Sequence, residues 1–172
     1  FPGDVRNNMC YAWMMGAAKL GMHFVAMGPE ELAKQMDKDV VNSTFAEARE
    51  NGGLIEITDN KADLKGADVI YGDVWASMGE EAQIPERVRL LSPFRVTEET
   101  LKATENPDVL YLHCLPSFHD FETKMAKEWH DKGVDIREVT DEVFRSRHSA
   151  VFDEAENRMH SIKAIMVATI GK

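Results

Sequence analysis

Apolar residues recur at three- and four-residue intervals along several stretches of the chain. Between residues 7 and 20 they form a single stripe that Gly21 follows, made of Met9, Ala12, Trp13, Met14, Ala17 and Leu20. This spacing is typical of an amphipathic helix, and a glycine just beyond it is a common helix end. The same argument predicts helices over residues 29–53 (with a break near Asn42), 84–91, 97–104, 122–133, 140–148 and 153–170, and a helical turn or two over residues 60–67.

Short apolar runs separate these helices. They are HFVAMG (23–28), LIEIT (54–58), DVIYGDVW (68–75), VLYLHC (109–114) and IREV (136–139), and each predicts a buried strand. Because strands alternate with helices, we expect an α/β fold, a three-layer sandwich with a Rossmann-like parallel sheet of about five strands. The opening FPGD, residues 1–4, is typical of the end of a further strand, which would make the chain a fragment; a simple loop is the alternative.

Composition is that of an ordinary globular protein. The 172 residues suffice for one well-buried domain, residues 1–172, and no apolar run is long enough for a membrane span. There are 20 basic and 30 acidic residues, so the net charge is −10. That charge argues against nucleic-acid binding, which needs a concentrated basic face. Two cysteines suggest a reducing compartment, although their number alone leaves one disulfide open.

Three unusual loops follow predicted strands at their carboxyl ends, where parallel sheets bind ligands. The first, GDVRNN (3–8), has one glycine and cannot cradle a pyrophosphate, so a nicotinamide cofactor is not expected. Asn7 and Asn8 in this loop can cap the next helix. Alternatively, an asparagine amide there donates to a ligand carboxylate beside the positive helix end.

The second loop, GDVWASMGEE (72–81), places an acid at a strand end. Asp73 can accept a hydrogen bond from an ammonium group, Ser77 can share it, and backbone N–H groups near Gly79 can bind a carboxylate. An ordinary turn with Trp75 and Met78 packed inward is the alternative. Composition alone favours the ordinary turn.

The third loop is HCLPSFHD (113–120). His113, Cys114, His119 and Asp120 are metal-ligand types, but their spacing matches no common metal motif. A Cys–His nucleophile and a plain buried cysteine are the other interpretations. In the last helix Arg158 can reach a carbonyl or phosphate oxygen, whereas a solvated helix face is the alternative for such a charge run.

Several segments together resemble the ornithine carbamoyltransferase family. They are GDVRNN, KLGM, GADVIYGDVWASMGEE, YLHCLPSFHD and TDEVFRSRHSAVFDEAENRMHSIKAIMVATIG, in this order from Gly3 to Gly171. Each segment alone is a weak indication of the family, whereas the combination of all of them in one chain is specific for it. The resemblance is to the family's second, ornithine-binding domain. The Ser-Thr-Arg-Thr-Arg and His-Pro-x-x-Gln segments of the family's first domain, which binds carbamoyl phosphate, do not occur in this sequence.

The resemblance implies carbamoyl transfer from carbamoyl phosphate to the side-chain amine of L-ornithine, giving citrulline and phosphate. Asn8 and the backbone N–H of Met78 would hold the ornithine carboxylate. Asp73 and Ser77 would take the α-amino group, and Cys114 would lie beside the attacking amine.

The same resemblance puts the Leu115 carbonyl near the carbamoyl nitrogen and Arg158 on the carbamoyl oxygen. Catalysis would depend on Asp73, Cys114 and Arg158, with no metal and no organic cofactor. Carbamoyltransferases that act on aspartate need basic groups for its second carboxylate, and this chain has SMGEE at that place. By the same resemblance, carbamoyltransferases that act on putrescine lack the Ser-Met-Gly triplet. Both therefore rank below ornithine. A non-catalytic amino-acid-binding module and a Cys/His metal protein are the alternatives from other classes.

The family forms trimers or multiples of them, largely through the first domain. The expected partners are therefore L-ornithine, carbamoyl phosphate and further copies of the complete protein, with no nucleic acid and no membrane. Helix 149–172 would pack back on the first domain. The chain alone is expected to be inactive and prone to association through that helix. A cytoplasmic location is expected, and a mitochondrial one stays open because an organelle signal would precede Phe1.

Overall fold

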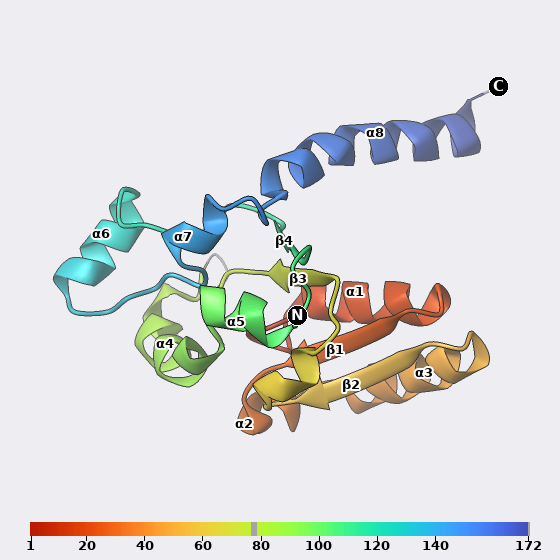
Figure 1. The fold of residues 1–172 in the computed structure, drawn as a ribbon, viewed down its shortest axis with the longest axis horizontal. Coiled ribbons are helices and arrows are strands. Elements are labelled where there is room, and N and C mark those ends of the chain that lie inside the picture. The colour runs from red at the N-terminus through yellow and green to blue at the C-terminus, as the bar shows by residue number, and fades with distance from the viewer. Residues whose placement is uncertain (77–78, 172) are drawn as a thin grey trace.

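The computed structural model describes residues 1–76 and 79–171, in which strands and helices alternate as the sequence predicts (Figure 1). The strands are β1 (His23–Met27), β2 (Leu54–Thr58), β3 (Val69–Gly72) and β4 (Leu110–His113). The helices are α1 (Asn8–Lys19), α2 (Glu30–Ala33), α3 (Lys38–Glu50), α4 (Ile84–Leu91), α5 (Glu98–Ala103), α6 (Lys124–Asp131), α7 (Asp141–Phe144) and α8 (Val151–Ile170). Short 3-10 turns lie at Lys61–Leu64, Glu81–Gln83 and Ser92–Phe94.

Within the described residues the strands pair in parallel as β1 with β2 and β3 with β4. The expectation of a single sheet of about five strands is therefore not confirmed. Residues 1–3 do run parallel to β1, through a bridge from Pro2 to Met27, and the Phe1 ring stacks on Tyr71 of β3. Figure 1 accordingly shows the N-terminus beside β1 and β3. Pro2 has no N–H to donate to a neighbouring strand. Residues 1–3 are also too few to form a ladder that joins the pair β1 and β2 to the pair β3 and β4.

Two sequence predictions about individual elements were wrong. IREV is not a strand, because its one ladder contact is an isolated bridge between Val139 and Val96. The long helix predicted over residues 29–53 is interrupted before Asp37 and not near Asn42. Asp37 caps α3 by accepting hydrogen bonds from the Asp39 and Val40 backbone N–H groups, and this local bond starts a new helix.

Two clusters of buried side chains form the main core. One lies where α1 and α3 cover β1 and β2, and it contains Cys10, Met14, Ala18, Ala26, Ala48, Ile55 and Trp75. The other surrounds β3, β4, α5 and α7, and it contains Leu64, Ile70, Val96, Val109, Tyr111, Val139, Val143 and Val151. Both clusters hold the strands rigidly, so the loops at their carboxyl ends start from fixed positions.

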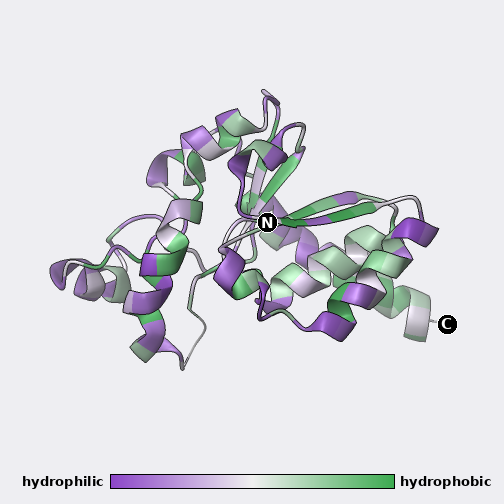
Figure 2. Cartoon of the chain, turned by 90° about the horizontal axis from the view of Figure 1, so that it is seen from below, coloured by the Kyte–Doolittle hydropathy of each residue, from purple (hydrophilic) through white to green (hydrophobic). Residues whose placement is uncertain are grey.

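Helix α8 differs from the other helices because it projects away from the body of the molecule (Figure 1). Beyond its first turn every described residue of the helix is exposed. The exposed apolar side chains are Phe152, Met159, Ile162, Ile165, Met166, Val167 and Ile170. Figure 2 shows this apolar character toward the C-terminus. In the part of the chain described here, no helix has both the length and the apolarity that crossing a bilayer requires.

Candidate functional site

The loops after β3 and β4 meet because the two strands end side by side. Gly72 is the register partner of His113, so the next residues, Asp73 and Cys114, are neighbours. The Cys114 thiol donates a hydrogen bond to Asp73 Oδ1 over 3.1 Å, and the Val74 backbone N–H donates to the same oxygen over 2.8 Å. Asp73 is only 8% exposed. The structure therefore brings together two of the side chains that the sequence singled out.

The Cys114 thiol is held in its protonated form. Burial raises its pKa to about 12, and the hydrogen bond and negative charge of Asp73 act in the same direction. Both ring nitrogens of His113 face other groups: Nδ1 accepts from the Leu115 backbone N–H, and Nε2 lies 3.2 Å from Glu138 Oε1. A thiolate activated by that histidine is therefore not what this geometry supports.

The loop before α1 contributes a polar hollow of about 330 Å³. Asn7 caps α1 by accepting from the Met9 backbone N–H over 2.9 Å, which leaves Asn8 with an exposed side chain on this hollow. Trp75, two residues after Asp73, lines it as well. Asn8 thus lies on the same end of the strands as Asp73.

Charged side chains fix the wall of this hollow. Arg87 of α4 binds Asp4, and its other terminal nitrogen is 3.0 Å from Glu80. Arg6 also binds Asp4, over 2.9 Å, and the hydrogen bond to Asp4 raises the pKa of the Arg6 guanidinium. These contacts tie the loops after residues 3 and 72 to one another.

An apolar cavity of about 380 Å³ adjoins the same loops. Its walls come from Val74, Trp75 and Ala76 on one side and from Pro116 and Phe118 on the other. Leu115, the residue before Pro116, is half-buried and has a positive φ of 51°, a strained conformation for a bulky side chain. Ser77 and Met78, both predicted site residues, lie outside the described residues.

Helix α8 is joined to the two strand ends by Glu154. Its Oε1 accepts from the Tyr71 hydroxyl over 2.9 Å and its Oε2 accepts from the His113 backbone N–H over 3.0 Å. Burial is the largest cause of a raised pKa at Tyr71, and Glu154 adds to it. Arg158 follows one helical turn later on an exposed part of α8. Within residues 1–76 and 79–171 its side chain has no ion pair.

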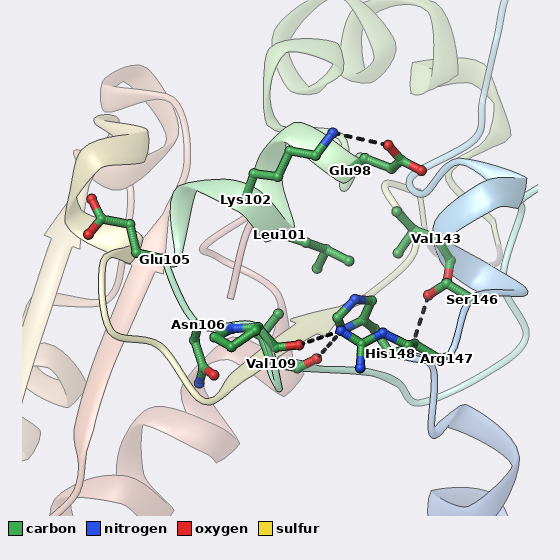
Figure 3. A pocket seen from close by; sticks show the side chains of 11 residues that line it. Glu98, Leu101, Lys102, Glu105, Asn106, Val109, Val143, Ser146, Arg147 and His148 are labelled. Carbon is green, nitrogen blue, oxygen red and sulfur yellow. Dashed lines mark hydrogen bonds and ion pairs between the residues drawn. The ribbon is translucent and has the colours of Figure 1, made fainter.

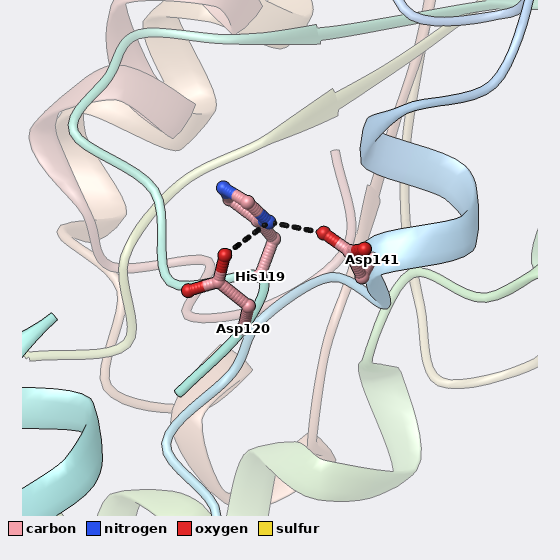
Figure 4. A group of neighbouring side chains, drawn as sticks. All are labelled: His119, Asp120 and Asp141. Carbon is pink, nitrogen blue, oxygen red and sulfur yellow. Dashed lines mark hydrogen bonds and ion pairs between the residues drawn. The ribbon is translucent and has the colours of Figure 1, made fainter. Parts of the chain in front are cut away.

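The predicted set of metal-ligand types is divided by the structure. His113 and Cys114 belong to the site above, whereas His119 and Asp120 meet Asp141 (Figure 4). His119 Nδ1 lies 2.6 Å from Asp141 Oδ1 and 3.5 Å from Asp120 Oδ2. The Arg145 guanidinium binds both carboxylates, so a cation from the chain itself already neutralises them.

A further pocket of about 430 Å³ lies at the opposite, amino end of β4 (Figure 3). Leu101, Val109 and Val143 supply its apolar part. Arg147 donates to the Pro107 carbonyl and His148 Nδ1 lies 2.8 Å from the Val109 carbonyl, so its polar side chains already have partners in the chain.

Glu138 and Glu154 were missed as contributors to the site. Glu138 could have been found, because it lies in the apolar run IREV, whose Ile136 and Val139 are buried, and an acid in a buried segment needs partners. For Glu154 the sequence offered only its place in the EAENR segment, one helical turn before Arg158.

The family described as aspartate/ornithine carbamoyltransferase, Asp/Orn binding domain, matches residues 1–169. The chain belongs to this carbamoyltransferase family.

The chain is 57% identical over its whole length to an ornithine carbamoyltransferase of Clostridium perfringens, of which it covers 52%. It is 50% identical to a catabolic ornithine carbamoyltransferase of Bacillus licheniformis, with 98% of this chain and 50% of that protein covered. The solved ornithine carbamoyltransferase of Pyrococcus furiosus superposes with a TM-score of 0.80 at 36% identity, over 98% of this chain and 48% of that one. The carbamoyltransferase domain described here therefore spans about half the length of these relatives, and its fold is the α/β fold of that family.

Proposed function

We propose that this chain supplies the ornithine-binding half of an enzyme that transfers a carbamoyl group to the side-chain amine of L-ornithine. The donor is carbamoyl phosphate, and the products are citrulline and phosphate. The observation that carries the proposal is the contact between Cys114 and Asp73 at the joined ends of β3 and β4, with Asn8 on the same end. The names of the relatives, ornithine carbamoyltransferases at up to 57% identity, support the same substrate.

The amino-acid end of ornithine is held by charge and by amide groups. Asp73 accepts from the α-ammonium group, and Ser77 shares that donor. Asn8 and the Met78 backbone N–H donate to the carboxylate. A substrate bound in this way keeps its charged end in the polar hollow and extends its side chain toward Cys114.

The reacting end must be a neutral amine, because an alkyl ammonium has a pKa of about 10.4 and has no lone pair to attack with. Cys114 meets this need as a protonated thiol packed against the apolar cluster around α1, β1 and β2, since apolar surroundings disfavour a positive charge. The carboxylate of Asp73, already engaged by the α-ammonium group, does not hold the second charge. In this proposal the neutral amine attacks the carbamoyl carbon while the Leu115 carbonyl orients the carbamoyl nitrogen. The bond between that carbon and the phosphate oxygen then breaks, and the departing phosphate takes up the proton that the amine loses.

Arg158 stabilises the negative charge that grows on the carbamoyl oxygen during the attack. No metal or organic cofactor is needed, because positioning and this charge stabilisation supply the catalysis. The exposed apolar side chains of α8 suit a helix that packs on the other half of the complete protein, and that half also binds the phosphate and forms the trimer.

Turnover tests the proposal directly. The 172-residue chain alone should form no citrulline from ornithine and carbamoyl phosphate, whereas the full-length protein that contains it should. In the full-length protein Asp73→Asn should lower kcat/KM for ornithine roughly 10- to 150-fold, the loss expected for one hydrogen bond to a charged group. Asp59→Asn, on an exposed loop, is the matched control.

Equal use of putrescine and ornithine by the full-length protein would contradict the assignment of Asp73 and Asn8, because putrescine has no carboxylate or α-amino group. Ornithine binding with no citrulline under any condition would instead favour a non-catalytic binding module.

A further inference from the structure

A buried carboxylate lies behind the loop that carries Cys114. Glu138 is 2% exposed, and within the described residues it forms no ion pair with a lysine or arginine. Its Oε1 accepts from the Ser117 hydroxyl over 2.7 Å and from the Phe118 backbone N–H over 2.6 Å. The same oxygen lies 3.2 Å from His113 Nε2. Glu138 Oε2 is buried and has no hydrogen-bond partner among the described residues, so the hydrogen bonds that hold this carboxylate all involve Oε1. Burying a carboxylate is costly, and these bonds to residues 117 and 118 offset part of the cost.

The His113 ring lies between this carboxylate and the start of the loop. Its Nδ1 accepts from the Leu115 backbone N–H over 2.9 Å, so Nδ1 carries no proton and the ring proton is on Nε2. Nε2 lies 3.2 Å from Glu138 Oε1, and within the described residues it has no hydrogen-bond acceptor. The His113 backbone N–H in turn donates to Glu154.

The position of the His113 ring is also fixed from the side of β3. A Cβ atom at Gly72 would lie 3.0 Å from His113 Cδ2 and 2.5 Å from the Tyr111 hydroxyl oxygen. Only glycine fits there, directly before Asp73. The ring is therefore confined between β3 and Glu138, and it is 1% exposed.

We propose that Glu138 and His113 are positioning residues that hold residues 114–118, and with them the Cys114 thiol and the Leu115 carbonyl, in place beside Asp73. Donors at both ends of this loop converge on the pair, at Leu115 and at Ser117 and Phe118. A buried carboxylate without a cationic partner is less favourable than apolar packing, so stability alone does not account for Glu138. The effect on catalysis rests on the proposed carbamoyl transfer, whereas the effect on the loop does not.

Two substitutions of His113 separate the loss of its hydrogen bond from the Leu115 N–H from a mere change in side-chain volume. In His113→Asn the side-chain oxygen takes the place of Nδ1 and can still accept from Leu115. In His113→Gln the amide reaches the place of Nε2 and leaves the Leu115 N–H without an acceptor. A long-range ¹H–¹⁵N spectrum of the chain should show the wild-type His113 ring protonated on Nε2.

The rate of Cys114 alkylation by iodoacetamide, followed by peptide mass spectrometry, measures how well the loop keeps the thiol in its buried position. We expect His113→Gln to raise the rate roughly tenfold or more, the effect of one unsatisfied buried donor, and His113→Asn to stay near wild type. Glu138→Gln should give a smaller rise, since a neutral acceptor makes hydrogen bonds about half as strong as a carboxylate. It also serves as the decisive variant if His113→Gln does not fold. His148→Gln, at the other end of β4, is the control and should leave Cys114 unchanged.

In the full-length protein His113→Gln should lower kcat about 100-fold with a much smaller change in KM for ornithine, and His113→Asn should restore most of it. Equal rates of alkylation and turnover in both His113 variants would overturn the proposal, as would a Glu138→Gln variant that alkylates like wild type. If the alkylation pattern holds but the full-length wild type forms no citrulline, the proposed function fails and the positioning stands.

Discussion

Glu154 offers a sharp test of how α8 is attached to the site. Glu154→Ala removes the acceptor of two donors, the Tyr71 hydroxyl and the His113 backbone N–H. Both donors lie at strand ends, and Tyr71 is 6% exposed. The substitution changes little else, because alanine is a good helix former and most of α8 beyond this turn is exposed.

The expected cost follows from these two hydrogen bonds. A buried donor left without an acceptor costs about 1–3 kcal/mol. Glu154 is half-buried, so water can reach the space that its side chain leaves, and the lower bound applies to each donor. The total is about 2 kcal/mol of unfolding free energy, which corresponds to roughly a 30-fold change in an opening equilibrium.

Urea unfolding of the chain measures the change in unfolding free energy. Amide hydrogen exchange at His113 measures the change in the opening equilibrium. We expect a lower midpoint with an unchanged m-value, and faster exchange of the His113 amide. Glu156→Ala, on the exposed side of the same helix, is the control and should change the unfolding free energy by less than about 0.5 kcal/mol. A Glu154→Ala chain that matches the Glu156→Ala chain in both measurements would refute the assigned hydrogen bonds.

Other predictions concern the thiols and one arginine. Asp73→Asn should lower the pKa of Cys114 from about 12 without restoring its ordinary value, because burial is the largest cause of the shift; the pH dependence of Cys114 alkylation measures this. The pKa of Cys10 is also raised by burial, from 9.0 to about 12, so the unfolded state loses that proton first. The unfolding free energy should therefore fall as pH rises from about 9 to about 12, and less steeply in Cys10→Ala. Arg87→Ala strips the buried Asp4 of a charge partner and should cost about 3 kcal/mol in urea unfolding.

Each of these has a clear contrary outcome. An alkylation pKa of Cys114 that Asp73→Asn leaves unchanged would show that the hydrogen bond between them does not exist in solution. A flat stability between pH 9 and pH 12 would show that the thiols are accessible to water. An Arg87→Ala chain as stable as the exposed control Lys124→Ala would show that Asp4 is satisfied by Arg6 alone.

The order of the elements and the loops of the candidate site could be predicted from the amino-acid sequence. Period-two and period-3.6 patterns depend on residues a few positions apart, so β1, β2, β3, β4 and most helices appear where they were predicted. The same local signals failed at IREV, where strand-forming side chains gained one isolated bridge and no ladder. A strand needs a partner, and the partner is not a local property.

Which residues contact one another depends on the packing of segments that are distant in the sequence. Asp73 and Cys114 are 41 positions apart, and the parallel register of β3 and β4 makes them neighbours. Glu138 and Glu154 gained their roles in the same way, because burial forces each carboxylate to find donors on whichever segment packs against it. The residue types along the chain determine which chemical groups are present, and the packing of distant segments determines the distances between those groups.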